Sequence, residues 1–149
     1  MTEAGAVPGE RIFVALGSNL GEREENLRAA LNRLGELPGT VVVRVSTFRE
    51  TAPWGVTEQP AFLNAVAELR STLEPEALLA AAKAIERDLG RTPTYRWGPR
   101  LIDIDLLLYG ERRMQTETLT LPHPGLLERD FVREPLVEIA PEVVAALCG

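Results

Sequence analysis

The sequence predicts an α+β sandwich, a single domain in which two helices pack on an antiparallel sheet and a hairpin strand is appended. Three observations lead to this fold class. Short apolar or alternating runs indicate strands, two amphipathic stretches indicate helices, and the segments follow the order β, α, β, β, α, β. Because two strands follow each other directly between the helices, we expect antiparallel pairing.

The first half of the chain is predicted to begin with a loose tail over residues 1–10. Residues 12–16, IFVAL, form a short apolar run bounded by glycine, which indicates a buried strand. The GSNLG segment after it is interpreted as a turn into a helix, because it lacks the lysine and the glycine spacing of phosphate-binding loops. Apolar residues recur at helical spacing over residues 22–34, and the β-branched run at residues 41–48 indicates a second strand.

The second half of the chain repeats this alternation of elements. Residues 62–70, FLNAVAELR, alternate between the two faces of a strand. A second helix is predicted over residues 75–89, since proline opens it and glycine follows it. Residues 101–110, LIDIDLLLYG, give the strongest strand signal, and a shorter strand is expected near residues 119–121. The final segment, residues 135–149, has a mixed pattern.

The composition is that of an ordinary globular protein, with 45% hydrophobic and 26% charged residues. The formal net charge of −6 argues against a nucleic-acid partner or an anionic membrane surface, since both bind basic proteins. The one cysteine, Cys148, cannot form a disulfide within the chain. The first residues lack the features of a signal peptide, and no apolar run reaches membrane-spanning length. We therefore expect a cytoplasmic protein.

Asp103 and Asp105 are the first candidates for chemistry. Residues two apart on a strand project from the same face, with Cα atoms about 7 Å apart. Two carboxylates on one face repel unless a cation lies between them, and Mg²⁺ sites combine one or two carboxylates with substrate phosphates. The alternative is that this face only meets solvent, and the residues alone leave both interpretations open. The apolar residues expected on the opposite, core-facing side are Ile102, Ile104, Leu106 and Leu108.

Residues 91–100 form a predicted loop that contains Arg91, Arg96 and Arg100 and places Trp97 between the last two. Guanidinium groups can bind phosphate oxygens in a forked geometry, and an indole can stack on a ring. For this segment alone, a solvated loop whose tryptophan covers the core is the plainer interpretation. Beside a strand with paired aspartates, however, the cations suit a polyphosphate and the aspartates suit its metal.

His123, the one histidine of the chain, lies in the segment LPHPGLLERDF. A single histidine without a neighbouring cysteine cannot make the usual zinc site, so a hydrogen-bonded loop histidine is the plain alternative to a functional one. Arg129 and Phe131 follow closely and could supply a further cation and a stacking face.

Five segments together resemble the successive signatures of one protein family. They are VALGSNLG, ETAPWG, QPAFLNAV, RWGPRLIDIDLLLYG and LPHPGLLERDFVREPLVEIAPE, and they occur in this order between residues 12 and 142. They are similar to the 6-hydroxymethyl-7,8-dihydropterin pyrophosphokinases of folate biosynthesis, and the fourth segment is the most specific. The resemblance implies a ferredoxin-like fold for a single domain over residues 1–149. It also implies an ATP-binding transferase, a kinase that moves the β,γ-diphosphate of ATP to the pterin hydroxymethyl oxygen and releases AMP.

The resemblance further implies roles for individual residues. Asp103 and Asp105 would hold two Mg²⁺ ions and, with Arg91 and Arg100, would form the catalytic group. The residues implied in ATP binding are Glu86, Arg91, Trp97, Arg100, Thr120, His123 and Arg129. Those implied in pterin binding are Thr51, Trp54, Phe62, Asn64, Trp97 and Phe131; the two phenylalanines would sandwich the ring and the asparagine would hydrogen-bond its edge. We expect ATP and the pterin to be the only partners, with no nucleic acid or membrane, and the protein to be a monomer.

Between residues 12 and 142, the chain departs from the family pattern at a loop and at one residue of a predicted helix. The loop at residues 91–96 is one residue shorter than in some members, with Pro93 and Thr94 where others carry basic residues, and Lys83 stands where some carry glutamine. Two other functions remain open from the residues. One is a binding module that senses a nucleotide without turnover, and the other is a kinase that transfers only the γ-phosphoryl group.

Overall fold

The structure, a computed structural model, describes residues 10–51, 61–90 and 101–148. Its strands are β1 (Glu10–Ser18), β2 (Thr40–Val45), β3 (Arg49–Thr51), β4 (Phe62–Ser71), β5 (Asp103–Tyr109), β6 (Met114–Gln115) and β7 (Thr120–Leu121). Its helices are α1 (Arg23–Gly35), α2 (Pro75–Leu89), α3 (Asp130–Ile139) and α4 (Pro141–Cys148). No helix in the three described ranges combines the length and the apolar character needed to cross a membrane.

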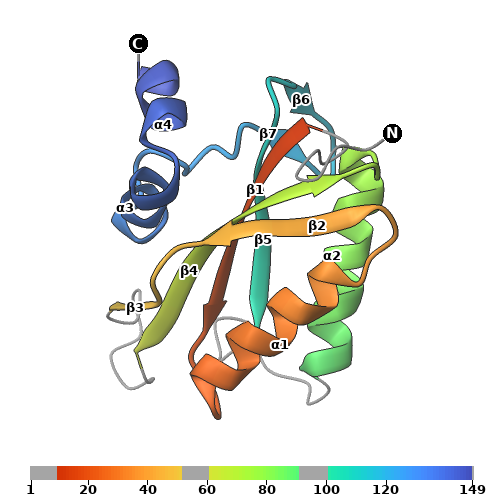
Figure 1. Cartoon of the computed structure of the whole chain (residues 1–149), viewed down its shortest axis with the longest axis vertical. Helices are drawn as coiled ribbons and strands as arrows, with labels where there is room; N and C mark the ends of the chain where they lie inside the picture. Colours follow the sequence, from red (N-terminus) through yellow and green to blue (C-terminus); the bar gives the residue numbers. More distant parts are fainter. Residues whose placement is uncertain (1–9, 52–60, 91–100, 149) are drawn as a thin grey trace.

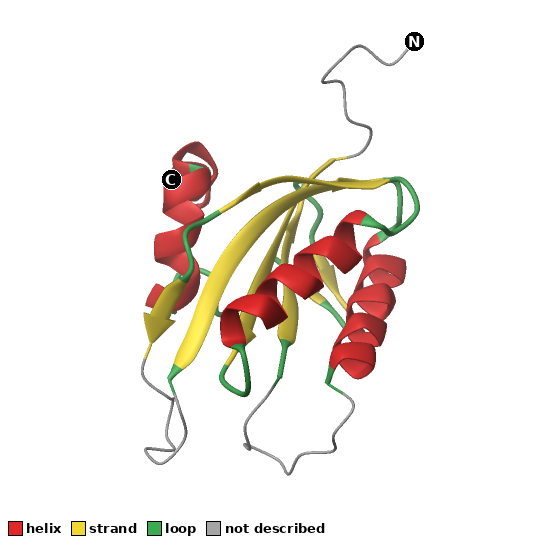
Figure 2. Ribbon diagram, turned by 60° about the horizontal axis from the view of Figure 1, so that its bottom comes forward, coloured by secondary structure: helices red, strands yellow, loops and turns green. Residues whose placement is uncertain are grey.

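A five-stranded antiparallel sheet lies between two pairs of helices (Figures 1 and 2). α1 and α2 cover one face of the sheet, whereas α3 and α4 pack on the other. The strand order is β2-β4-β1-β5, with β3 also paired to β4, so that β1 lies in the centre between β4 and β5. β6 and β7 form a separate hairpin. The predicted antiparallel α+β sandwich, with its order of strands and helices and its appended hairpin, is therefore confirmed.

The helices α3 and α4 are the main addition to the predicted fold. The pattern of the last segment was mixed because Pro135 lies inside α3 and Pro141 begins α4. A proline inside a helix removes one backbone hydrogen bond and usually ends the helix. Here Val132, Leu136 and Ile139 still recur at helical spacing and bury a stripe of α3 against the sheet, which offsets that loss.

The strand predicted at residues 41–48 is shorter in the structure, and a short strand that the sequence did not predict follows it. β2 ends at Val45 and β3 begins at Arg49. Between them, Ser46 N–H donates to the Val66 carbonyl at 2.9 Å, and Ser46 Oγ accepts from the Val66 N–H at 2.9 Å. Because a hydroxyl takes the place of a backbone acceptor, the regular ladder to β4 is interrupted at this point.

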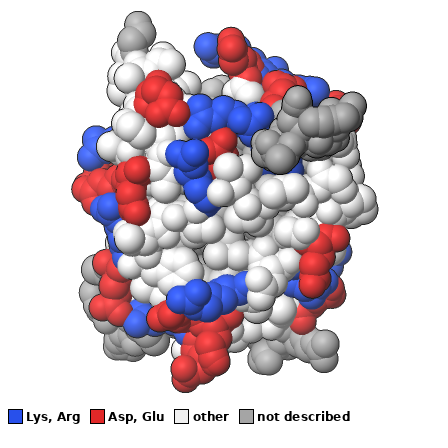
Figure 3. All heavy atoms as spheres, in the orientation of Figure 1, with Lys and Arg blue, Asp and Glu red and all other residues white. Residues whose placement is uncertain are grey.

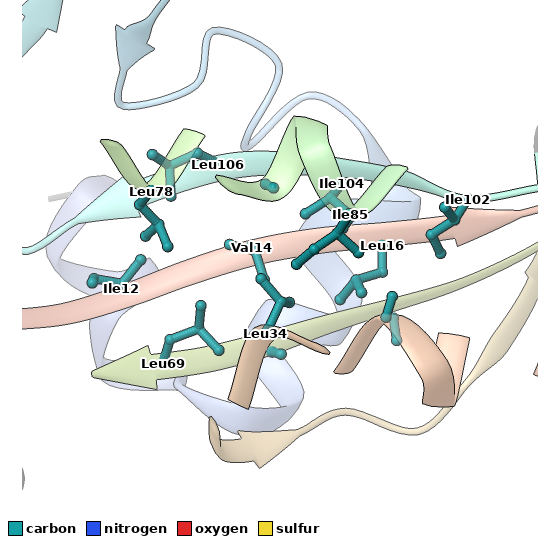
Figure 4. Close-up of a cluster of buried hydrophobic side chains, with 14 of the residues drawn as sticks. Ile12, Val14, Leu16, Leu34, Leu69, Leu78, Ile85, Ile102, Ile104 and Leu106 are labelled. Atoms are coloured by element: carbon teal, nitrogen blue, oxygen red, sulfur yellow. The ribbon is translucent and has the colours of Figure 1, made fainter. Parts of the chain in front are cut away.

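The larger core lies between the sheet and the helices α1 and α2 (Figure 4). Residues of β1, β4 and β5 that share one sheet face point into it, as the two-residue period of a strand requires. The residues that Figure 4 labels are Ile12, Val14, Leu16, Leu34, Leu69, Leu78, Ile85, Ile102, Ile104 and Leu106.

The smaller core lies under α3 and α4, and a β-bulge brings two successive residues of β5 into it. Phe13 of β1 pairs with Leu108. Val14 pairs with Leu106, so Leu107 has no partner in β1. Leu107 and Leu108 both pack in the cluster that contains Phe13. The expectation that Leu108 would face the same core as Leu106 was wrong, because the bulge shifts the alternation by one residue.

Glu68 of β4 ties the C-terminal helices to the sheet. Its side chain is 2% exposed and accepts hydrogen bonds from Arg11 at 2.8 Å and 3.2 Å. Arg11 also lies 3.0 Å from Glu142 of α4. Arg44, which lies 3.5 Å from Glu68, donates to the Ile139 carbonyl at the end of α3 at 3.0 Å. Elsewhere on the surface, acidic and basic side chains also lie beside one another (Figure 3).

We expect Glu68→Gln to lower the free energy of unfolding by about 2 kcal/mol, because it removes the buried carboxylate that holds Arg11 and Arg44. The loss stays below that of a fully buried pair because the Arg11 side chain is 32% exposed and can be hydrated. Urea denaturation measures it. The control is Glu24→Gln, which breaks an exposed pair with Arg28 and should cost less than about 0.5 kcal/mol. Equal losses would contradict the anchoring role of Glu68.

Candidate active site

Beyond the smaller core, the sheet face that carries α3 continues into small and polar residues. Ala15 and Gly17 of β1 belong to this face because Phe13, at the same two-residue spacing, packs in the smaller core. Gly17 pairs with Asp103 of β5 on one side and with Asn64 of β4 on the other. These three residues form a row across the sheet, in which the backbones of the aspartate and the asparagine lie two strand spacings, or about 10 Å, apart.

Asp103 and Asp105 project from the same face of β5, as the sequence predicts. Asp105 pairs with Ala15, so the second carboxylate begins the next row. Both aspartates are half-buried, and Ile104 between them is fully buried in the larger core. Within the described residues, no group of three histidine, cysteine, aspartate or glutamate side chains could hold a metal ion. Among the described residues, the pair therefore offers a cation two carboxylates.

Gly17 makes room for the side chains of Asn64 and Phe62. A Cβ atom at Gly17 would lie 3.0 Å from Asn64 Oδ1 and 3.5 Å from the Phe62 ring. Asn64 itself is 7% exposed, and its Nδ2 donates to Thr51 Oγ1 at 2.6 Å. The sequence interpretation placed Gly17 in a turn, but β1 extends to Ser18, so the role of this residue was missed. The available signal was a glycine that continues a strand, which marks close approach of another group.

The bulge in β5 also anchors His123. The carbonyl of Leu107, the residue that has no partner in β1, accepts a hydrogen bond from the His123 N–H at 2.9 Å. This bond holds the segment after β7 against β5. His123 is thereby close enough to Asp105 for the negative charge of the carboxylate to raise the pKa of the imidazole, against the effect of burial. Bulges are frequent next to functional sites because they re-aim side chains and free backbone groups.

The surroundings of His123 favour a neutral imidazole with its proton on Nε2. The Gly125 N–H donates to Nδ1 at 3.0 Å, so Nδ1 acts as an acceptor. Burial lowers the pKa of His123, Asp105 opposes this, and Arg129 lowers the pKa further, with a net decrease. At neutral pH, Nε2–H is therefore a fixed hydrogen-bond donor for an oxygen or nitrogen of a ligand.

A cavity of about 250 Å³ is lined by both His123 and Asp105. Its lining includes Leu79, Lys83, Asp105, Leu106, Thr120 and His123. The two leucines offer apolar surface to a ring, and the other side chains offer polar and charged groups, a combination typical of small-molecule sites. The structure thus brings together Thr120 and His123, both implied in nucleotide binding, and one of the two aspartates.

Glu86 and Lys83 bind the edge of β5 beside this cavity. Glu86 Oε2 accepts from the Ile104 N–H at 2.6 Å and lies 3.3 Å from Lys83 Nζ. Lys83 Nζ also donates to the Ile104 carbonyl at 3.3 Å. The two side chains therefore satisfy the outward backbone groups of an edge strand. Lys83 is the member of this pair that lines the cavity.

Arg129 and Phe131 lie where α3 begins. The Arg129 N–H donates to the Gly125 carbonyl at 3.1 Å, which continues the hydrogen-bonded turn that starts at His123. The Arg129 guanidinium carbon lies 5.9 Å from the centroid of the Phe131 ring. Because α3 packs against β4, this cation and this ring lie on the sheet face that also carries Phe62.

Four predicted site residues, Trp54, Arg91, Trp97 and Arg100, lie outside the described residues. They belong to residues 52–60 and 91–100, the segments that connect β3 to β4 and α2 to β5. These connections lead directly into Phe62, the first residue of β4, and to the start of the strand that carries the aspartates. The roles of the four residues stay predictions.

The fold is that of an α+β sandwich, and the candidate site combines a carboxylate pair, a histidine and a small cavity at the edge of its sheet. The model of the family 7,8-dihydro-6-hydroxymethylpterin-pyrophosphokinase (HPPK) matches residues 13–141. The chain belongs to this family. The resemblance seen in the sequence is thereby confirmed.

Curated relatives agree with this assignment. The 2-amino-4-hydroxy-6-hydroxymethyldihydropteridine pyrophosphokinase of Bacillus subtilis is 44% identical over 131 residues, which cover 88% of this chain and 78% of the relative. The protein of the same name from Pseudomonas aeruginosa is 44% identical over 134 residues, or 90% and 83% of the two chains. A mitochondrial folate synthesis bifunctional protein of Arabidopsis thaliana is 48% identical over 128 residues, which cover 86% of this chain and 23% of the relative.

A solved structure supports the fold alone. The crystal structure of an HPPK-DHPS protein in complex with substrates superposes with a TM-score of 0.67 at 15% sequence identity. The superposition covers 91% of this chain and 41% of that chain, so the structure compared contains much that has no counterpart here.

We expect Gly17→Ala to displace the Asn64 side chain by a few tenths of an ångström and to lower the free energy of unfolding by about 1 kcal/mol, because a new methyl group would overpack this contact. The Asn64 side-chain amide signal in NMR spectra and urea denaturation measure the two effects. The control is Gly35→Ala, whose Cβ would meet Val42 at an ordinary 3.7 Å and which should not destabilise the protein. An unmoved Asn64 signal in Gly17→Ala would refute the steric argument.

We expect the pKa of His123 in the folded protein to lie below the ordinary value of about 6.5. Because folding lowers this pKa, the contribution of neutral His123 to stability is present above about pH 6.5 and is lost as the pH falls through the folded pKa. Protonation turns Nδ1 into a donor and breaks its bond with Gly125. As the chain has one histidine, an NMR titration gives a single imidazole curve. A midpoint at or above 6.5 would contradict this interpretation.

Proposed function

We propose that this protein transfers the diphosphate group of ATP to the hydroxymethyl group of 6-hydroxymethyl-7,8-dihydropterin and releases AMP, as an enzyme of folate biosynthesis. The family and the names of the relatives support this activity. The observation that carries the proposal for this chain is the row Asp103–Gly17–Asn64. On one side of Gly17 lies Asp103, whose carboxylate suits the metal ion of a polyphosphate. On the other side, on the same face of the sheet, lies Asn64, whose amide suits the edge of a heterocyclic ring.

The nucleotide half of the proposed site is the cavity beside β5. Thr120 and Lys83 supply polar contacts for the nucleoside, and His123 Nε2–H supplies a donor that Gly125 holds in one tautomer. Arg129 supplies a cation for the phosphates. From the resemblance we add Arg91, Trp97 and Arg100 to this half. We also add Glu86, which binds both Lys83, a residue of the cavity lining, and the backbone of β5.

The two carboxylates of β5 fit magnesium. Mg²⁺ prefers oxygen ligands and is commonly bound by one or two carboxylates together with substrate phosphates. Asp103 and Asp105 would hold two such ions. The ions would neutralise charge that develops on the phosphate oxygens during transfer. The structural support is the donor set itself, since both carboxylates share one sheet face beside a cavity that has further polar groups.

The pterin half of the proposed site is the face of β4 and β3. Asn64 is held by Thr51 and keeps a carbonyl oxygen and a second amide hydrogen for the edge of the ring. Phe62 and Phe131 supply aromatic surface on β4 and α3. From the resemblance we add Trp54 and a second contact through Trp97.

The chain needs no side-chain nucleophile for this reaction. Phosphoryl transfer depends mainly on positioning and on stabilisation of charge, which the aspartates, the arginines and the rigid sheet supply. The row through Gly17 and the row through Ala15 would hold the hydroxymethyl group and the phosphates on one sheet face. The register of β1 with β4 and β5 would then set the distance between these two groups.

We also propose that the protein acts as a monomer in the cytoplasm, with ATP and the pterin as its only partners. Some plant relatives are named as mitochondrial proteins.

Incubation with ATP, Mg²⁺ and the hydroxymethylpterin tests the activity directly. One AMP released for each pterin consumed supports a pyrophosphokinase. Release of ADP would mean that only the γ-phosphoryl group moves, and binding without turnover would mean a nucleotide sensor. Either result would overturn the proposal.

We expect Asp103→Asn and Asp105→Asn to fold normally and to lose turnover by a factor on the order of 100 or more, because each removes a few kcal/mol of charge stabilisation. The AMP-release assay measures the loss, and thermal unfolding checks the fold. The control is Glu24→Gln on α1, which breaks an exposed ion pair with Arg28 and should keep wild-type turnover. Wild-type rates in both β5 variants would dismiss the metal assignment.

A further inference from the structure

Glu138 of α3 binds Thr47, which lies between β2 and β3, and Arg49, the first residue of β3. The Thr47 N–H donates to Glu138 Oε2 and the Thr47 hydroxyl donates to Oε1, both at 2.9 Å. Arg49 of β3 donates to the same Oε1 at 3.1 Å. One carboxylate thus fastens the C-terminal half of α3 to the start of β3.

The helix face that carries Glu138 also carries Phe131. Phe131, Glu134 and Glu138 are spaced by three and four residues, so they lie along one side of α3. Glu134 lies 3.5 Å from Arg49, a weaker contact of the same kind. The side of α3 that faces β3 therefore begins with the aromatic ring and ends with the carboxylate.

β3 connects this contact to the opposite wall of the pterin half. Arg49 pairs with Asn64, and Thr51 pairs with Phe62. Thr51 Oγ1 accepts the hydrogen bond from Asn64 Nδ2 at 2.6 Å. A displacement of β3 relative to α3 would therefore move Asn64 and Phe62 relative to Phe131.

The charge on Glu138 is suited to this contact. Burial raises its pKa, but the hydrogen bonds from the Thr47 backbone and hydroxyl and the Arg49 guanidinium lower it more, so the net shift is downward. Glu138 is therefore ionised at neutral pH, and charge-assisted hydrogen bonds of this type are stronger and shorter than neutral ones.

We propose that Glu138 is a positioning residue for the pterin half of the site, which fixes the separation between Phe131 on α3 and the wall formed by Thr51, Phe62 and Asn64. This inference rests on the proposed function. Stacking between aromatic rings depends on separation and offset, so a pocket with an aromatic surface on each wall needs its walls held apart at a defined distance. Glu138 lies on the side of α3 that is nearest β3 and binds that strand directly, whereas the buried residues of α3 only press the helix onto the sheet.

The test compares steady-state kinetics of the wild type and Glu138→Ala in the AMP-release assay. We expect the KM for the pterin to rise about tenfold, the equivalent of losing one well-placed aromatic contact, while the KM for ATP changes less than about twofold. Glu138→Gln keeps an acceptor for the Thr47 N–H and should recover part of the loss. Phe131→Ala, which removes the ring itself, gives the scale of a complete loss.

The matched control is Arg133→Gln, which breaks the exposed pair of α3 with Asp130 at 2.7 Å and should leave both KM values unchanged. A purely structural role for Glu138 would lower the melting temperature and leave the pterin KM of the folded enzyme as in the wild type, and that result would overturn the inference. Equal increases of both KM values would also overturn it.

Arg49→Met tests the same contact from β3 if Glu138→Ala does not fold. Combined with Glu138→Gln, it should raise the pterin KM less than the product of the two single effects, because both substitutions break one interaction. Effects that multiply would contradict the proposed contact. A wild-type protein that releases no AMP would refute the proposed function, whereas an active wild type with unaltered Glu138 variants would refute only the positioning role.

Discussion

The register of β1 between β4 and β5 is the constraint on which the candidate site depends. Gly17 stands between Asp103 and Asn64 only in this register. A slip by one residue would turn Leu16 toward the site and Gly17 toward the larger core, since successive side chains point to opposite faces. Burial prevents this slip, because Leu16 fills one core and Phe13 fills the other. The apolar packing that stabilises the sheet therefore also sets the spacing of the functional groups.

Hydrogen bonds fix the position of α3 at both of its ends. Its start is held by the turn from His123 to Arg129, which is bonded to β5 through Leu107. Its end is held by Arg44, which binds the Ile139 carbonyl. Phe131, near the start of α3, packs against the smaller core, on the sheet face from which the aspartates project, so the proposed site would draw on the C-terminal part of the described chain as well as on the sheet.

Local patterns were sufficient to predict β1, β2, β4, β5 and β7, the first two helices and the shared face of Asp103 and Asp105, because strand alternation depends only on the neighbouring residues. The bulge at Leu107 could not be predicted, since it is a mismatch between two strands far apart in sequence. The same holds for the backbone anchor of His123 and for the space that Gly17 leaves to Asn64. α3 was missed for a different reason, because Pro135 interrupts a helical pattern that tertiary packing sustains. Residue roles taken from the resemblance were more specific than any that spacing alone could give.

The pairing of β5 with β1 joins the first described strand to one that follows both α1 and α2 in the chain. Such a long-range pairing closes a large loop, whose entropy must be overcome before its contacts stabilise the fold. A chain in which β1, β4 and the two helices have formed still lacks the strand that bears the carboxylates. Both carboxylates therefore reach their places beside Ala15 and Gly17 only when this last pairing forms, so that completion of the sheet and completion of the candidate site are one event.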